Sequence, residues 1–147
     1  MLGRLARYLR LLGYDVSYPE SFPDKRLIAL ARSQGRILLT RDRAIARSES
    51  AGAGNPHVME ITSGRVIDQI LQLAEEGWIG RVLAPRCSRC NTLLEEIGQW
   101  EARHLLPPFT QATQLSSLYC PSCNSVLWEG SHWEHFRGMF SRGLLFD

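Results

Sequence analysis

Four cysteines and three aspartates are the residues whose types and spacing indicate chemistry in this 147-residue chain. The cysteines form two Cys-X-X-Cys pairs, Cys87–Cys90 and Cys120–Cys123, with 29 residues between them. One such pair could be a redox site or a coincidence, but two pairs in a chain with no other cysteine are typical of zinc binding. Four thiolates fill a ZnS₄ tetrahedron and leave no position for a substrate. We therefore predict a structural zinc ion bound by Cys87, Cys90, Cys120 and Cys123.

The aspartates Asp15, Asp24 and Asp42 are placed for a different chemistry. Asp42 follows a predicted strand, Asp24 begins the predicted helix that leads into that strand, and Asp15 lies on the strand before. Functional residues of parallel α/β sheets gather at the C-terminal ends of the strands. Carboxylates there supply the oxygen ligands that Mg²⁺ or Mn²⁺ needs for phosphodiester hydrolysis. Because Asp24 could equally cap its helix and Asp15 could simply be solvated, Asp42 is the strongest of the three candidates.

The first half of the chain reads as alternating helices and strands. Apolar residues at helical spacing predict a helix over Leu2–Leu12 that ends at Gly13, with Arg4, Arg7 and Arg10 on its solvent face. The elements expected after it are a strand over 14–18, a helix over 25–33, a strand over 36–40, a strand over 57–62 and a helix over 65–74. This alternation predicts an α/β domain with a parallel sheet over residues 1–80.

After Gly80 the composition changes, because cysteines, prolines and tryptophans replace the regular apolar pattern. We therefore place a domain boundary there and predict a small zinc-ribbon region over residues 81–147. His132 and His135 lie near tryptophans and could bind a second metal, but without nearby carboxylates we favour packing or RNA contact.

Composition and charge limit the classes of function. The longest apolar run, Leu27–Ala31, is far too short to span a membrane, and arginines interrupt the first dozen residues where a secretory signal would lie. We therefore expect a cytoplasmic protein. Residues 1–47 carry a net charge of +6 and residues 48–147 a net charge of −4. All basic residues except Lys25 are arginine, which suits phosphate binding, although a solvated basic face would look the same.

Several motifs occur in an order that resembles a known family. The segments are LGRLARYLRLLGYDV, GRILLTRDR, CSRCN, YCPSC and VLWEGSHW, and together they run through nearly the whole chain. They resemble the PIN-like ribonuclease domain with a C-terminal zinc ribbon, the Mut-seven C-terminal RNase domain family. The resemblance implies a three-layer PIN-like fold with a parallel sheet, a zinc ribbon and metal-dependent RNA cleavage by clustered acids. Asp42 matches the acid after the Thr-Arg pair, and Asp24 matches the acid that opens the second helix.

The resemblance also implies a strand ending in an aspartate just before the LGRLAR segment, where this sequence has only Met1. Either a longer form of the chain supplies that strand, or one carboxylate of the site is missing. In the second case we expect weaker cation binding and slow or absent cleavage, because the number and charge of the ligands set the affinity for a hard cation.

Three functions therefore follow from the sequence. The first is a ribonuclease in which Mg²⁺ or Mn²⁺ is bound by Asp42 and Asp24, with Asp15 as a weaker third ligand. In this enzyme, the backbone of the RNA substrate would be positioned by Arg7, Arg41 and Arg43. The second is a non-catalytic RNA- or ribosome-associated binding module, in which the ribbon and the arginines form the platform. The third is a basic surface that binds an acidic protein. The oligomeric state is left open.

Overall fold

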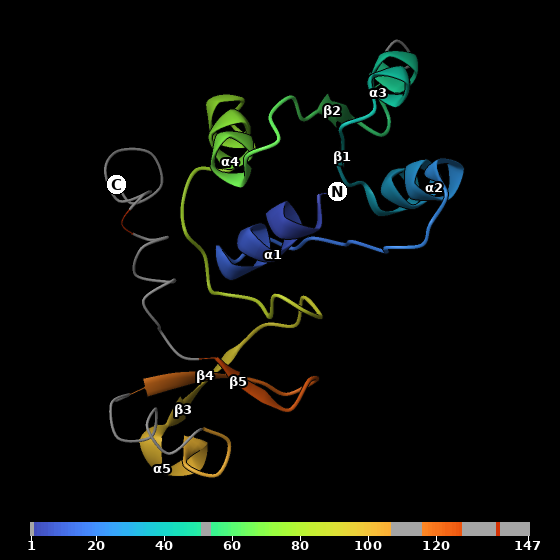
Figure 1. The fold of residues 1–147 in the computed structure, drawn as a ribbon. Coiled ribbons are helices and arrows are strands. Elements are labelled where there is room, and N and C mark those ends of the chain that lie inside the picture. Colours follow the sequence, from blue (N-terminus) through green and yellow to red (C-terminus); the bar gives the residue numbers. More distant parts are fainter. Residues whose placement is uncertain (1, 51–53, 107–115, 128–137, 139–147) are drawn as a thin grey trace. The chain divides into compact units, whose positions relative to one another are not determined.

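The computed structural model of the protein describes residues 2–50, 54–106, 116–127 and 138. Its elements run in the order α1 (Gly3–Leu11), α2 (Asp24–Gln34), β1 (Leu38–Thr40), α3 (Arg43–Ser50), β2 (Val58–Glu60), α4 (Val66–Glu75), β3 (Glu95–Gly98), α5 (Gln99–Ala102), β4 (Ser116–Cys120) and β5 (Ser125–Leu127) (Figure 1). The chain divides into two compact units, the first formed by Met1–Leu5 and Tyr18–Leu73 and the second by Ala6–Ser17 and Ala74–Asp147. Helix α1 thus contributes to both units. The predicted boundary after Gly80 stays a prediction.

The first unit is built on a parallel pair of strands. β1 pairs with β2 in a register that places Leu38 opposite Val58 and Thr40 opposite Glu60. Helix α2 packs on β1, and helix α3 packs on both strands (Figure 1). Val58, Met59 and Ile61 are buried, as expected for an apolar strand covered by helices. The predicted parallel α/β arrangement is therefore confirmed.

Helix α1 confirms the predicted apolar face but corrects the predicted basic face. Leu5, Ala6, Leu9 and Leu12 are all buried. Arg4 and Arg7 are exposed, as expected. Arg10, however, is buried, with only 8% of its surface accessible to solvent, so the prediction that it lies in solvent was wrong. Its guanidinium is buried because backbone carbonyl groups of the second unit accept its hydrogen bonds, which helical spacing does not reveal.

The segment Tyr14–Tyr18 was predicted as a strand, and the structure contains no strand there. The hydrogen bonds of its central residue explain the difference. The Val16 amide donates to Asn91 Oδ1 (3.1 Å), and the Val16 carbonyl oxygen accepts from Arg10 Nε (3.0 Å). Side chains therefore satisfy the backbone groups that a neighbouring strand would otherwise pair.

The ends of helices α2 and α4 follow the sequence closely, with one correction. Gly35 terminates α2 in the left-handed conformation (φ 62°), where glycine carries no steric penalty. Asp24 is the first residue of α2, and Pro23 is the N-cap residue without a side-chain cap, so the alternative in which Asp24 caps this helix is wrong. Before α4, Ser63 Oγ accepts a hydrogen bond from the Arg65 amide (3.1 Å), as a capping serine does.

The second unit contains an antiparallel sheet in the order β3-β4-β5. Glu95 of β3 lies opposite Tyr119 of β4, and Cys120 of β4 lies opposite Ser125 of β5. Cys120 ends β4, and Cys123 lies in the turn between β4 and β5. His132 and His135 lie outside the described residues. Within the described part of the chain, no helix is both long enough and apolar enough to cross a membrane.

Candidate functional site

The two Cys-X-X-Cys pairs lie on two turns of similar design. The first turn is closed by backbone hydrogen bonds from the Cys87 amide to the Thr92 carbonyl oxygen (2.8 Å) and from the Asn91 amide to the Cys87 carbonyl oxygen (2.9 Å). In the second turn, between β4 and β5, the Cys123 amide donates to Cys120 Sγ (3.3 Å). Within each pair, the two sulfurs lie within 4.8 Å of each other.

An asparagine follows each cysteine pair in the left-handed region of backbone conformation. Asn91 has a φ of 69° and Asn124 a φ of 49°. Asparagine enters this region more readily than other residues with a side chain. It therefore lets the chain reverse immediately after the second cysteine of each pair, which the repeated Cys-X-X-Cys-Asn pattern in the sequence could have indicated.

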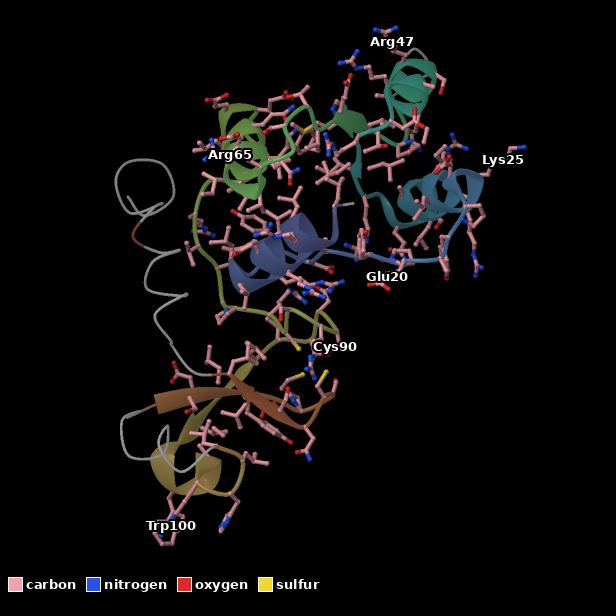
Figure 2. The ribbon with its side chains drawn as sticks, viewed as in Figure 1. Glu20, Lys25, Arg47, Arg65, Cys90 and Trp100 are labelled. Atoms are coloured by element: carbon pink, nitrogen blue, oxygen red, sulfur yellow. The ribbon has the colours of Figure 1, made fainter. Side chains whose placement is uncertain are left out.

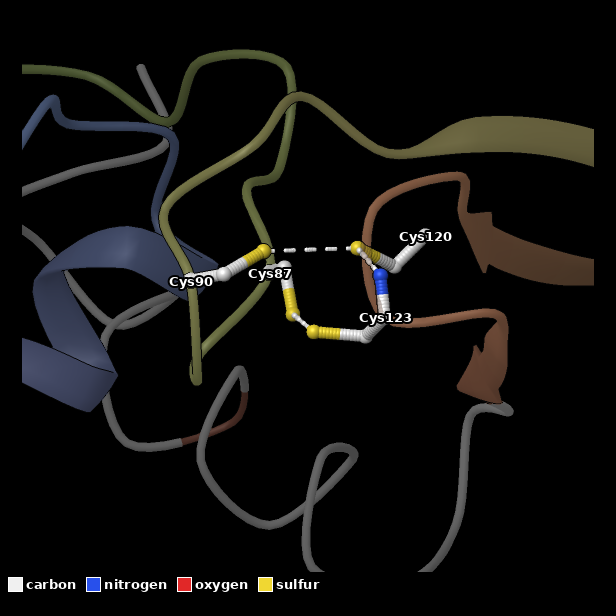
Figure 3. Close-up of side chains that lie close together, drawn as sticks. All are labelled: Cys87, Cys90, Cys120 and Cys123. Atoms are coloured by element: carbon white, nitrogen blue, oxygen red, sulfur yellow. Dashed lines mark hydrogen bonds between the residues drawn. The ribbon is translucent and has the colours of Figure 1, made fainter.

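The four cysteines form one cluster (Figure 3). Their sulfurs all lie within 4.8 Å of one another, with Cys90 Sγ 3.5 Å from Cys120 Sγ and Cys87 Sγ 3.9 Å from Cys123 Sγ. A tetrahedral zinc ion with Zn–S bonds near 2.3 Å requires sulfurs about 3.8 Å apart. The spacing and the thiol chemistry therefore fit zinc, and the cluster is consistent with a zinc ribbon on the mixed α/β fold.

The thiols differ in acidity because their surroundings differ. A hydrogen bond with Thr92 Oγ1, 3.2 Å from the sulfur, lowers the pKa of Cys90 to about 6. The hydrogen bond with Cys90 raises the pKa of Cys123 to about 12, and burial raises the pKa of Cys120. Without a cation, these neighbours cannot all be ionised together, whereas a bound dication stabilises all four thiolates.

Asp42 lies where the sequence places it, beyond the C-terminal end of β1 in the first unit. Its Oδ1 accepts hydrogen bonds from the amides of Ala44 (2.7 Å) and Ile45 (3.3 Å), so the residue caps helix α3. The Asp42 amide in turn donates to Thr40 Oγ1 (3.0 Å). Both capping bonds use the same carboxylate oxygen, and neither engages Oδ2. The carboxylate is exposed.

Glu60 is a second carboxylate at this edge of the sheet, and the sequence reasoning missed it. It ends β2 directly opposite Thr40, and its carboxylate binds Arg43 at 3.3 Å. The side-chain amide of Gln72 donates to the Glu60 carbonyl oxygen (2.7 Å) and so fixes the end of the strand. The signal for Glu60 was available, because a parallel partner strand must end at the same edge as β1.

Asp24 and Asp15 lie in different compact units. Asp24 is exposed at the start of α2 in the first unit. In the second unit, Asp15 Oδ1 accepts a hydrogen bond from Asn91 Nδ2 (2.6 Å), next to the first cysteine pair. Among the residues that the structure describes, only the cysteines form a group of three or more potential metal ligands. The role of Asp42, Asp24 and Asp15 in binding a catalytic cation stays a prediction.

Several basic side chains of the first unit are exposed. Lys25, Arg47 and Arg65 project outward from the region of α2, α3 and α4 (Figure 2). Arg41 is also exposed. Arg43 forms an ion pair with Glu60. The predicted contacts of Arg7, Arg41 and Arg43 with RNA remain predictions.

Comparison with protein families gives a match that spans nearly the whole chain. The model of the family described as the Mut7-C RNAse domain matches residues 1–140. The chain belongs to the Mut7-C RNase domain family. Neither the curated proteins nor the solved structures contain a match to it.

Membership of the Mut7-C RNase domain family confirms the family resemblance seen in the sequence and implies a nuclease-like function with RNA as the substrate. The matched region contains both the aspartates and the four cysteines. The cysteine cluster of this Mut7-C chain fits a structural zinc ion, as its geometry already indicates.

Proposed function

We propose that the protein is a ribonuclease that hydrolyses RNA phosphodiester bonds with the help of Mg²⁺ or Mn²⁺. The observation that carries this proposal is the match of residues 1–140 to the Mut7-C RNase domain. The placement of Asp42 beyond the end of a parallel strand supports it, because that edge is where α/β sheets gather functional groups. The structural zinc belongs to the ribbon and takes no part in the reaction.

Asp42 is the main proposed ligand of the catalytic cation, since its Oδ2 takes part in neither capping bond. Asp24 is the second. It is the first residue of α2, the helix that leads directly into β1. Asp15 is the weaker third candidate, and its Oδ1 accepts a hydrogen bond from Asn91.

The proposed reaction is attack of water on the phosphorus, with the phosphorus–oxygen bond of one ribose broken and that oxygen protonated as it leaves. The cation, when bound, supplies charge stabilisation for the attacking and leaving oxygens. The carboxylates position it. Arg7, Arg41 and Arg43 are proposed to hold the RNA backbone through its phosphates, which accounts for the excess of arginine in the first 47 residues.

A second candidate function is an RNA-binding module without catalysis. The observation in its favour is that Asp42 caps a helix and that, within the described residues, no three carboxylates come together. In this case the arginines and the ribbon bind RNA and the acids are structural. Both functions are proposed for the cytoplasm, where the cysteines remain reduced and able to bind zinc.

Incubation of the protein with end-labelled single-stranded RNA distinguishes the two functions. Because strong chelators also remove zinc, the catalytic cation is withdrawn by desalting into metal-free buffer, and the zinc content is measured before each assay. The ribonuclease proposal predicts cleavage that returns on addition of Mg²⁺ or Mn²⁺. RNA binding without cleavage under any cation, at full zinc content, contradicts it and supports the binding module.

A further inference from the structure

Arg10 is a buried cation directed at the first cysteine pair. Its Nη1 donates to the carbonyl oxygens of Ser88 (3.0 Å) and Arg89 (3.2 Å), the two residues between Cys87 and Cys90. Its Nε donates to the Val16 carbonyl oxygen (3.0 Å). One planar guanidinium thus binds both the turn that carries two sulfurs and the segment that follows helix α1, all within the second unit.

Residues next to the first cysteine pair also form hydrogen bonds with the segment that follows helix α1. Asn91, immediately after Cys90, accepts a hydrogen bond from the Val16 amide (3.1 Å) and donates one to Asp15 Oδ1 (2.6 Å). The Arg86 amide, immediately before Cys87, donates to the Arg10 carbonyl oxygen (2.8 Å). The residues on both sides of the first cysteine pair are therefore held by residues 10–16.

The charge of the cluster gives Arg10 a second effect. Four thiolates and one Zn²⁺ carry a net charge of −2, and a buried negative group is costly unless a cation compensates it. Cys87 and Cys90 are close enough to interact electrostatically with Arg10. Arg86, half-buried beside Cys87, donates from Nη1 to the Asn91 carbonyl oxygen (3.0 Å) and supplies a second positive charge.

We propose that Arg10 is a positioning residue for the metal bound by the four cysteines. Its guanidinium fixes the backbone of the first cysteine pair and compensates the thiolate charge. Because such coupling is reciprocal, metal binding in turn stabilises residues 10–16, including Asp15, by the same free energy. Zinc loading therefore controls the order of a segment that contributes no ligand to the metal.

The proposal is tested by the rate at which the full chain, loaded with Zn²⁺, releases the metal to a coloured chelator. Arg10→Gln removes the charge and the forked donor, and we expect release about 10–100-fold faster, the usual effect of losing a group that orients metal ligands. Arg4→Gln, an exposed residue of the same helix, is the matched control and keeps the original rate. Equal rates for the two variants would overturn the proposal.

Arg10→Lys keeps the charge but cannot reach all three carbonyl oxygens at once, so we expect an intermediate release rate. The visible spectrum of the Co²⁺-loaded protein reports the geometry of the sulfur ligands. We expect Arg10→Gln to change this spectrum, whereas a general loss of stability would leave it unchanged in the folded fraction. An unchanged spectrum and release rate for folded Arg10→Lys would contradict the proposal.

A second pair of variants keeps the test valid if Arg10→Gln does not fold. Asn91→Gly deletes the bonds to Asp15 and Val16 but suits the left-handed backbone. Asn124→Gly makes the same change after the second cysteine pair, where the asparagine instead accepts from Tyr119 Oη. We expect faster metal release from Asn91→Gly alone. Equal acceleration in both variants would overturn the role of residues 10–16.

Hydrogen exchange tests the reciprocal effect. Removal of zinc from the original protein should speed exchange of the backbone amides of residues 10–17, while residues 66–73 of helix α4, which lie in the first unit, serve as the reference. Unchanged exchange over residues 10–17 after complete zinc removal would overturn the proposed coupling.

Discussion

Asn91 and Asp15 are 76 residues apart in the sequence, yet Asn91 Nδ2 donates a hydrogen bond of 2.6 Å to Asp15 Oδ1. One partner follows the first cysteine pair, and the other is a proposed ligand of the catalytic cation. The bond therefore joins the turn of the first cysteine pair to the segment after α1, both within the second unit. It also shows that the segment after α1 belongs with the cysteine cluster in the second unit rather than with the parallel strands.

The cysteine cluster predicts one zinc ion per chain. Elemental analysis of the purified protein should give a ratio close to one, and Cys120→Ser should lower both this ratio and the stability of β3, β4 and β5, because Cys120 is fully buried between the strands and the cluster. Pro121→Ala, an exposed residue of the turn that follows Cys120, is the control and should retain the metal. A zinc content near zero in the original protein, with the cysteines paired as disulfides, would contradict this prediction.

Gly13 should tolerate no side chain. It has a φ of 95°, and an added Cβ would lie 2.5 Å from Leu83 Cβ and 2.6 Å from the Ala84 carbonyl oxygen. The backbone conformation alone costs about 1–3 kcal/mol for a residue with a side chain. Gly13→Ala should therefore reduce the free energy of unfolding in urea by at least this amount. Gly80→Ala adds a methyl group with no heavy atom within 4 Å and should be nearly neutral. Equal unfolding midpoints for the two variants would count against the close packing at Gly13.

The ion pair between Arg43 and Glu60 predicts unequal contributions of two neighbouring arginines to RNA binding. Arg41→Ala should weaken binding of single-stranded RNA. It should also reduce the slope of the logarithm of the binding constant against the logarithm of the salt concentration by about 0.7 for each lost phosphate contact. Arg43→Ala should have a smaller effect, because Glu60 already offsets the charge of Arg43.

Glu60→Gln provides the complementary test, since it frees Arg43 and should strengthen binding most at low salt. The measurement is a titration of labelled RNA at several salt concentrations. If Arg41→Ala and Arg43→Ala weaken binding equally and Glu60→Gln has no effect, the ion pair does not tune RNA contact.

Local patterns in the sequence were sufficient for the apolar face of α1, the end of α2 and the metal ligands. The burial of Leu5 and Leu9 follows from helical spacing, the end of α2 follows from Gly35, and the cysteine cluster follows from the paired spacing. Each of these features depends on residues a few positions apart, or on ligands whose chemistry requires them to meet. Such information is present in a single sequence.

The features that were missed depend on contacts between distant segments. Arg10 was expected in solvent because its neighbours Arg4 and Arg7 are exposed, but its hydrogen-bond partners lie 78 and 79 residues further along the chain. Val16 alternates like a strand residue, yet side chains satisfy its backbone groups. Nothing in the local pattern distinguishes these cases from an ordinary helix face and an ordinary strand.

Asp42 has two roles that its substitutions can separate. Asparagine is as good an N-cap as aspartate, whereas alanine loses the cap of α3 and costs about 0.5–2 kcal/mol. Asp42→Asn should therefore unfold at the same denaturant concentration as the original protein, and Asp42→Ala at a lower one. If Asp42→Asn were as destabilised as Asp42→Ala, the charge of Asp42 would be structural and the activity of the variant would not report on the cation.

The ribonuclease account is tested most directly by the rate of Mn²⁺-dependent cleavage of single-stranded RNA by Asp42→Asn at a zinc content equal to that of the original protein. Asp68→Asn serves as the control, because Asp68 is not a proposed cation ligand and accepts a hydrogen bond from Ser63 Oγ. The account predicts that cleavage by Asp42→Asn is lost while the fold and the zinc remain, and that cleavage by Asp68→Asn continues. Cleavage by Asp42→Asn at the original rate would contradict the proposed mechanism.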